Sequence, residues 1–71
     1  MINREKLGNR IRDLVYKSDK TYREIADVIG ITDSAVAQWM SGMALPGTGT
    51  ILKVAKYFGT TVDALLDGCV E

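Results

Sequence analysis

The chain has 71 residues, enough for one small domain and close to the lower limit at which a chain buries its own core. Its net charge is zero, and hydrophobic residues make up 46% of it, as in ordinary globular proteins. No apolar run approaches the length of a membrane span, and no signal peptide is evident. The sequence has no histidine and only one cysteine, Cys69, so the usual zinc ligands and general bases are missing. We therefore expect a cytoplasmic protein with no cofactor, no metal, no membrane partner and no small-molecule ligand.

The charges are unevenly distributed despite the zero total. Residues 1–23 contain seven cations and three acids, whereas the remainder contains two cations and six acids. The seven cations are Arg4, Lys6, Arg10, Arg12, Lys17, Lys20 and Arg23. Such an asymmetry can give one basic face for a nucleic acid without a basic total. The alternative, that both halves are ordinary solvated helix surface, stays open.

Helical periodicity begins near the amino terminus. The first apolar stripe consists of Leu7, Ile11, Leu14 and Val15. Asn3 can cap this helix, and the polar residues 18–20 end it. A second helix is expected from Thr21, because residues 21–24 (TYRE) form a capping box between Thr21 and Glu24. Its apolar stripe consists of Tyr22, Ile25, Ala26 and Ile29.

The third helix is expected to follow after a very short turn. Gly30 supplies the left-handed residue that ends the second helix, and Thr32 can cap the third. The buried face of this helix consists of Val36, Trp39 and Met40, and Gly42 ends it. We assign Trp39 to the core rather than to base stacking, because it shares this stripe.

Residues 42–49 contain three glycines and the only proline, which predicts a loop. A fourth helix is expected over residues 51–58, ended by Gly59, and Thr61 can cap a short fifth helix. After Gly68 the chain is expected to fray, together with Cys69. The sequence therefore predicts an all-α fold, with five short helices in one compact domain over residues 1–71.

The connection between the second and third helices indicates their geometry. Only residues 30–32 join them, and so short a turn cannot fold two helices back into an antiparallel pair. The helices must cross steeply, with apolar Ile31 filling the corner. Residues 21–42 are therefore predicted to form a helix-turn-helix.

The outer face of the third helix carries short side chains and no charge other than that of Asp33. It consists of Ser34, Ala37, Gln38 and Ser41. An ordinary solvent face carries Lys, Glu and Arg, whereas short polar side chains let a helix enter the major groove and meet base edges. The competing interpretation is a short helix with an undistinguished surface.

These segments resemble the phage lambda repressor and Cro type (Xre family) of helix-turn-helix. The resemblance rests on residues 21–26 (TYREIA), 29–34 (IGITDS) and 36–39 (VAQW) with Gly42, and continues through Pro46, residues 51–59 (ILKVAKYFG) and 61–66 (TVDALL). It implies a five-helix domain, dimeric on double-stranded operator DNA, that regulates transcription in bacteria or their phages. A repressor is the favoured interpretation.

The resemblance also implies roles for individual residues. The positions that match base-contacting ones are Asp33, Ser34 and Gln38, with Ala35 and Ala37 as neighbours. Those that match phosphate-contacting ones are Thr21, Tyr22, Ser41, Gly42 and Met43, where free amides at helix ends suit an anion. Lys20 and Arg23 are added from their charge and location. A dimer interface is expected, by analogy, at Tyr57, Thr60, Thr61, Val62 and Leu65.

Several positions depart from the family pattern. Tyr22 stands where relatives have Gln, and residues 41–48 contain no cation, so fewer phosphate contacts are expected. Asp33 either complements the helix dipole or accepts from cytosine, and both interpretations stay open. An apolar pair, Val15 and Met40, stands where relatives often have an ion pair, and we predict that the two side chains touch.

Two other classes of protein remain as alternatives. A protein-interaction module of the same fold, of the antitoxin or anti-repressor type, is favoured slightly by the zero net charge and the uncharged loop. An enzyme is disfavoured, because no histidine and no cluster of acids is present.

Overall fold

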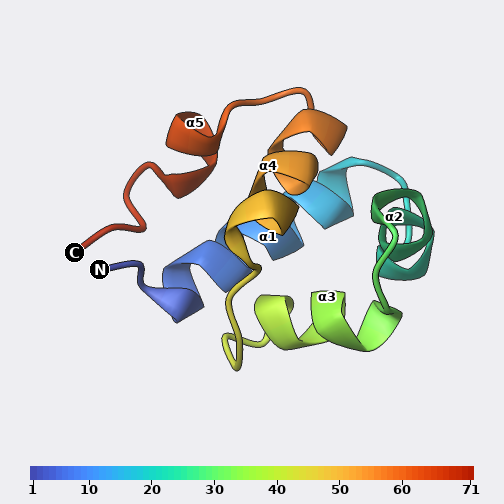
Figure 1. Ribbon diagram of the computed structural model, residues 1–71, viewed down its shortest axis with the longest axis horizontal. Helices are drawn as coiled ribbons and strands as arrows, with labels where there is room; N and C mark the ends of the chain where they lie inside the picture. Colours follow the sequence, from blue (N-terminus) through green and yellow to red (C-terminus); the bar gives the residue numbers. More distant parts are fainter.

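The computed structural model describes residues 1–71 as five helices joined by short connections (Figure 1). The helices are α1 (Arg4–Lys17), α2 (Tyr22–Ile29), α3 (Asp33–Met40), α4 (Thr48–Tyr57) and α5 (Val62–Leu66). In Figure 1, α1 and α4 lie at the centre, α2 and α3 toward one side, and α5 with both chain ends toward the other. None of the helices is long and apolar enough to cross a membrane. The predicted all-α, five-helix fold is confirmed.

Four of the five predicted helix starts are also confirmed in atomic detail. In four helices a side-chain oxygen accepts a hydrogen bond from the amide three residues later, at 3.0–3.2 Å. These caps are Asn3, Thr21, Thr32 and Thr61. The second half of the expected capping box is not formed, because the Glu24 carboxylate makes no hydrogen bond to the Thr21 amide.

One apolar core joins all five helices. Its buried members are Leu7, Ile11, Ile25, Ala26, Ile29, Val36, Trp39, Ile51, Val54, Ala55, Leu65 and Cys69. Val36 and Trp39 are only 1% and 6% exposed, which confirms the predicted inner face of α3. Trp39 is therefore a packing residue.

The fourth helix begins earlier than its apolar stripe indicates. α4 starts at Thr48, inside the segment 42–49 that was expected to be a loop, and Phe58 is its C-cap. Gly47 at its N-cap supplies no side-chain hydrogen bond, so this start lacks the usual local signal. The connection from α3 to α4 is accordingly shorter than expected.

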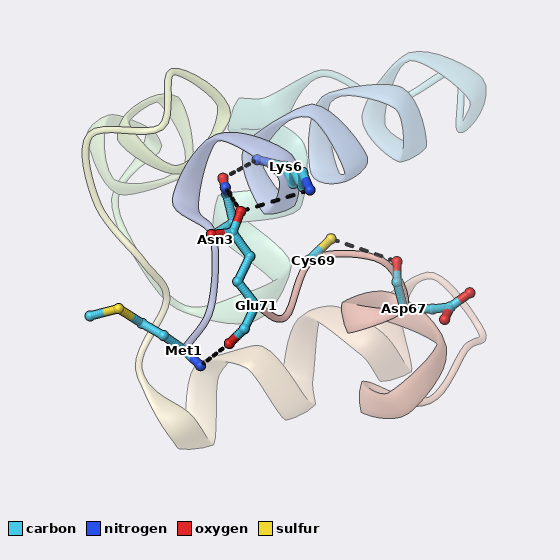
Figure 2. A network of polar contacts seen from close by, with 6 residues as sticks. All are labelled: Met1, Asn3, Lys6, Asp67, Cys69 and Glu71. Carbon is cyan, nitrogen blue, oxygen red and sulfur yellow. Dashed lines mark hydrogen bonds and ion pairs between the residues drawn. The ribbon is translucent and has the colours of Figure 1, made fainter.

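The end of the chain does not fray, and that expectation is wrong. Ile2 and Val70 form an antiparallel bridge, and the Asn3 amide donates to the Cys69 carbonyl at 2.7 Å. Figure 2 shows Glu71 reaching both the Met1 amino group and the Asn3 side chain. Cys69 is 1% exposed and belongs to the core. Residues 68–71 are therefore fixed against the amino terminus.

Helix α1 holds the carboxyl-terminal end of α3. A Cβ atom at Gly8 would lie 2.3 Å from the Trp39 carbonyl oxygen, so only glycine permits this approach of the two backbones. The Arg12 guanidinium donates to the Met40 carbonyl at 2.6 Å, one residue further along α3. A glycine inside a helical stripe is the sequence signal for such an approach, and the sequence reasoning missed it.

Val15 and Met40 lie on these same two helices. Both side chains are half-buried and pack against the core, from α1 and α3, which contact each other. Their direct contact stays a prediction.

Candidate nucleic-acid interface

The turn between α2 and α3 has the predicted geometry. Gly30 adopts a left-handed conformation with a φ of 87°, and its amide donates to the Ala26 carbonyl at 2.8 Å. The Ile31 amide donates to the same oxygen at 3.0 Å, and the Ile31 side chain is half-buried against the core. In Figure 1, α2 is seen nearly end-on while α3 runs across the view, so the two helices cross steeply. Residues 21–42 form a helix-turn-helix.

The outer face of α3 presents short polar side chains to solvent. Ser34, Gln38 and Ser41 are exposed, opposite the buried side chains of Val36 and Trp39. The Ser41 hydroxyl donates to the backbone carbonyl of Gln38 at 3.0 Å, and the side-chain amide of Gln38 makes no hydrogen bond within the protein.

The two predicted alanine neighbours on α3 are less accessible than the polar residues. Ala35 and Ala37 are both half-buried, and Ala35 packs against the core. Only a narrow strip of α3 is therefore fully exposed, and its polar centre is Gln38.

Asp33 and Arg23 form an ion pair across the turn. The Arg23 Nε atom lies 3.2 Å from Asp33 Oδ2, with 75% and 45% of the two side chains exposed. The pair lies at the rim of a shallow surface hollow between α2 and α3, which Asp27 also lines. A predicted base-contacting residue is thus bound to a predicted phosphate-contacting residue, a link that the sequence reasoning did not foresee.

The amino-terminal end of α2 is open to solvent. The Thr21 hydroxyl accepts from the Glu24 amide at 3.2 Å, whereas the amides of Tyr22 and Arg23 have no hydrogen-bond partner in the protein. Lys20 beside it is exposed and forms no ion pair, and Tyr22 is half-buried against the core. This end of α2 combines free amides, a cation and the positive end of the helix dipole.

The backbone amides of residues 41–43, which follow α3, were expected to be free to bind an anion. The amides of Ser41, Gly42 and Met43 all donate to carbonyls of α3, at 2.9–3.1 Å. They are therefore not free for a phosphate, and the carboxyl-terminal end of a helix carries the negative end of its dipole. The expectation of free amides here is wrong, and only the side chains of this segment can contact DNA.

Most cations of residues 1–23 have a hydrogen-bond or ion-pair partner within the protein. Arg10 and Arg12 donate to the carbonyls at the ends of α5 and α3, and Arg4 donates weakly, at 3.5 Å, to the Met43 carbonyl. Lys6, Lys17 and Arg23 form ion pairs with acids. Six of the seven cations thus have partners inside the protein, and Lys20 is the exception.

The expected dimer surface is only partly accessible. Tyr57, Thr60 and Val62 are half-buried, and Thr61 is exposed. Leu65 is 1% exposed and packs in the core of its own chain. Leu65 is therefore excluded as an interface residue, because it is the side chain of α5 that is fully buried in the core of its own chain.

No group of three or more His, Cys, Asp or Glu side chains gathers in the structure, so no residues can be assigned to a metal. The single cysteine lies in the core and faces the carbonyls of Leu65 and Asp67.

Residues 10–65 match a protein-family model described as helix-turn-helix, in agreement with the observed geometry. The chain belongs to the helix-turn-helix family. The expected membership of its lambda repressor-like branch is confirmed, and the matched segment contains the whole of α2, the turn and α3.

The helix-turn-helix domain is similar to a curated protein, the HTH-type transcriptional activator BcrR of Enterococcus faecalis. The two are 25% identical over 61 residues, which is 86% of this chain but only 30% of BcrR. The domain thus spans less than a third of the length of that relative.

Two solved structures resemble the helix-turn-helix domain closely. The SOS-response transcriptional repressor LexA of Eubacterium rectale superimposes with a TM-score of 0.86 and 28% identity, over 90% of this chain and 68% of that one. The clp gene regulator ClgR of Corynebacterium glutamicum gives a TM-score of 0.86 at 20% identity, over 97% and 73% of the two chains. The fold is that of the domain that such regulators contain.

Proposed function

We propose that residues 1–71 act as one sequence-specific DNA-binding domain of a transcriptional regulator, with α3 in the major groove. The observation that carries this proposal is the exposed, uncharged face of α3 around Gln38, held in a helix-turn-helix. Its short side chains let the helix enter a groove about 12 Å wide, and a glutamine can pair with adenine through two hydrogen bonds. Ser34 and Gln38 are the proposed direct base contacts, with Ala35 and Ala37 beside them.

The proposed phosphate contacts lie mainly at the start of α2. Lys20 and Arg23 bring positive charge there, and the free amides of the first turn, near Thr21 and Tyr22, can bind a phosphate oxygen. Ser41 and Met43 remain as side-chain contacts from the other end of α3. Because the cations available for phosphate are few, we expect a shallow dependence of affinity on salt.

We further propose a homodimeric repressor that acts on a pseudo-palindromic operator in the cytoplasm of a bacterium. A domain this small gains only about 3–5 kcal/mol from its own core, so a partner that covers apolar surface adds useful stability. The proposed interface is Tyr57, Thr60, Thr61 and Val62, at the end of α4 and the start of α5. Two copies of α3 would then enter major grooves about 34 Å apart.

Sedimentation at rising protein concentration tests the dimer. A molecule that stays monomeric, and binds single half-sites as well as full sites, would overturn the dimeric arrangement. The similarity to both an activator and a repressor makes a reporter assay, with the operator placed near a promoter, the test of repression.

A protein-interaction module of the same fold is the second candidate. The observation that favours it is the internal pairing of six of the seven cations in residues 1–23, together with the uncharged segment 41–48. Selection from a pool of random duplexes separates the two functions. Enrichment of one motif supports DNA recognition, and no enrichment at low salt supports the interaction module.

The sharper test is Gln38→Ala, measured on the selected duplex and its single-base variants. We expect a loss of preference at one base position, at a cost of about 1–3 kcal/mol there. Lys53→Ala is the control, since Lys53 is exposed on α4, outside the proposed interface. Unchanged affinity and preference in Gln38→Ala would show that α3 does not face the bases in this way.

A further inference from the structure

We propose that Arg23 is a positioning residue, which holds the Asp33 carboxylate toward the first base pair met by α3 and thereby selects cytosine at that position. The inference rests on the proposed DNA-binding function and deepens it, because it assigns one base preference to one pair of side chains.

The pair connects the two helices at their amino-terminal ends. Arg23 is the second residue of α2, and Asp33 is the first residue of α3. Their contact at 3.2 Å, from Nε to Oδ2, therefore fixes the Asp33 side chain relative to α2. Thr32, not Asp33, caps α3 by accepting from the Ala35 amide, so the carboxylate is not needed for the cap.

Both side chains keep unused hydrogen-bonding atoms. A guanidinium has five N–H donors, and the contact between Arg23 Nε and Asp33 is an ion pair that leaves its terminal nitrogens without a protein partner. The other carboxylate oxygen of Asp33, Oδ1, has no protein partner. Arg23 can therefore donate to a phosphate through its terminal nitrogens while it holds Asp33. The two roles do not compete.

The chemistry of a carboxylate determines which base it accepts. An ionised carboxylate only accepts hydrogen bonds, and the major-groove donors are the amino groups of cytosine and adenine. Adenine also presents its N7 acceptor beside the amino group, and guanine and thymine present acceptors, all of which repel a carboxylate. Cytosine is the base that offers a donor without an adjacent acceptor. The guanidinium also offsets the repulsion between Asp33 and the phosphates.

Asp27 provides a matched control within the same hollow. It lies one turn after Arg23 on α2 and lines the hollow, but it forms no ion pair with Arg23. Asp27→Asn and Asp33→Asn change the net charge equally. Only Asp33→Asn removes the carboxylate that Arg23 holds.

The test is selection from random duplexes by the folded wild-type chain and its variants, followed by affinity measurements on all four bases at the assigned position. We expect wild type to prefer cytosine, and Asp33→Asn to shift the preference to adenine by about tenfold, since an amide pairs with adenine. Arg23→Gln should weaken the cytosine preference about threefold, the scale of an exposed ion pair. In the Asp33→Asn background, Arg23→Gln should lower all affinities equally and change no preference. Asp27→Asn should leave the preference unchanged.

Three results would overturn the inference. The first is an Asp33→Asn variant that keeps the wild-type base preference at every position, while Gln38→Ala changes the preference at one base position. The second is an Arg23→Gln variant that weakens all duplexes equally in the wild-type background, which would make Arg23 a phosphate contact only. The third is enrichment of no duplex by wild type, in which case the proposed function itself fails. Circular dichroism of each variant shows whether it is folded.

Discussion

The cations on α1 and those at the start of α2 perform different tasks, although they follow one another in the same basic segment. Arg10 donates to the Ala64 carbonyl at 3.0 Å and to the Asp67 carbonyl at 2.7 Å, so its charge is used at the end of α5. Lys20 forms no ion pair, and Arg23 makes a single exposed contact. The unpaired carbonyls at a helix end attract a guanidinium, and α1 lies against two such ends. A count of cations along the sequence therefore overstates the number of cationic side chains that are free of partners within the protein.

The largest expected effect on stability is at Gly8, where the backbone of α1 approaches that of α3. Gly8→Ala should lower the free energy of unfolding by about 3 kcal/mol, because the new Cβ would overlap the Trp39 carbonyl. Thermal unfolding should show a fall in Tm of roughly 15 °C for a domain of this size.

The control for Gly8 is Gly49, which lies in α4 with no atom near its missing Cβ. Gly49→Ala should raise stability by about 0.5–1 kcal/mol, through helix propensity alone. If both substitutions stabilise the domain, α1 does not approach α3 as closely as described.

The second largest effect is expected at Arg10, one of the cations of α1 that bind backbone carbonyls within the protein. Arg10→Ala should lower the free energy of unfolding by about 1–2 kcal/mol, because the carbonyls at the end of α5 lose a charged donor. Its effect on DNA affinity should be negligible once folding is saturated at low temperature. Chemical denaturation and a binding titration on the same sample measure both quantities. A loss of affinity without a loss of stability would place Arg10 on the DNA instead.

The smallest expected effect is at Lys20, where we expect a change in DNA binding and none in stability. Lys20→Ala should leave stability unchanged but reduce the slope of log affinity against log salt by about 1, the value for one phosphate contact. Lys17→Ala is the matched comparison, because Lys17 is an exposed lysine bound to Asp13 at 3.0 Å. It should cost about 0.3–0.5 kcal/mol of stability and leave the salt slope as it was. If both variants had the same salt dependence of affinity, the cations of α1 and those at the start of α2 would not differ in their tasks.

The helix-turn-helix could be predicted from the sequence because its signals are local. Thr21, Thr32 and Gly30 act within three or four residues of their own positions, and the apolar stripes of α2 and α3 repeat within a single helix. The outer face of α3 follows from the same periodicity. The start of α4 was misplaced because Gly47 offers no capping side chain.

Several other errors come from pairing between distant residues. Cys69 was expected in a frayed tail because it follows Gly68 near the end of the chain, whereas its burial depends on residues at the other end of the chain. Leu65 was placed on the surface by analogy, although the core needs it. The partners of Arg10 and Arg12 are backbone carbonyls, which carry no sequence signal at all.

The bridge between Ile2 and Val70 has a consequence for the order in which the domain folds. Asn3 and Glu71, which also meet there, are 68 positions apart, whereas α2, the turn and α3 are adjacent along the chain. Helical contacts between neighbouring segments form fast, and contacts of long sequence separation wait until the rest of the chain has been ordered. The closure of the two ends is therefore the expected late event in folding, and these ends are the first part of the domain to separate when it opens locally. The amides of Asn3 and Glu71 should exchange with solvent well before those of the core helices.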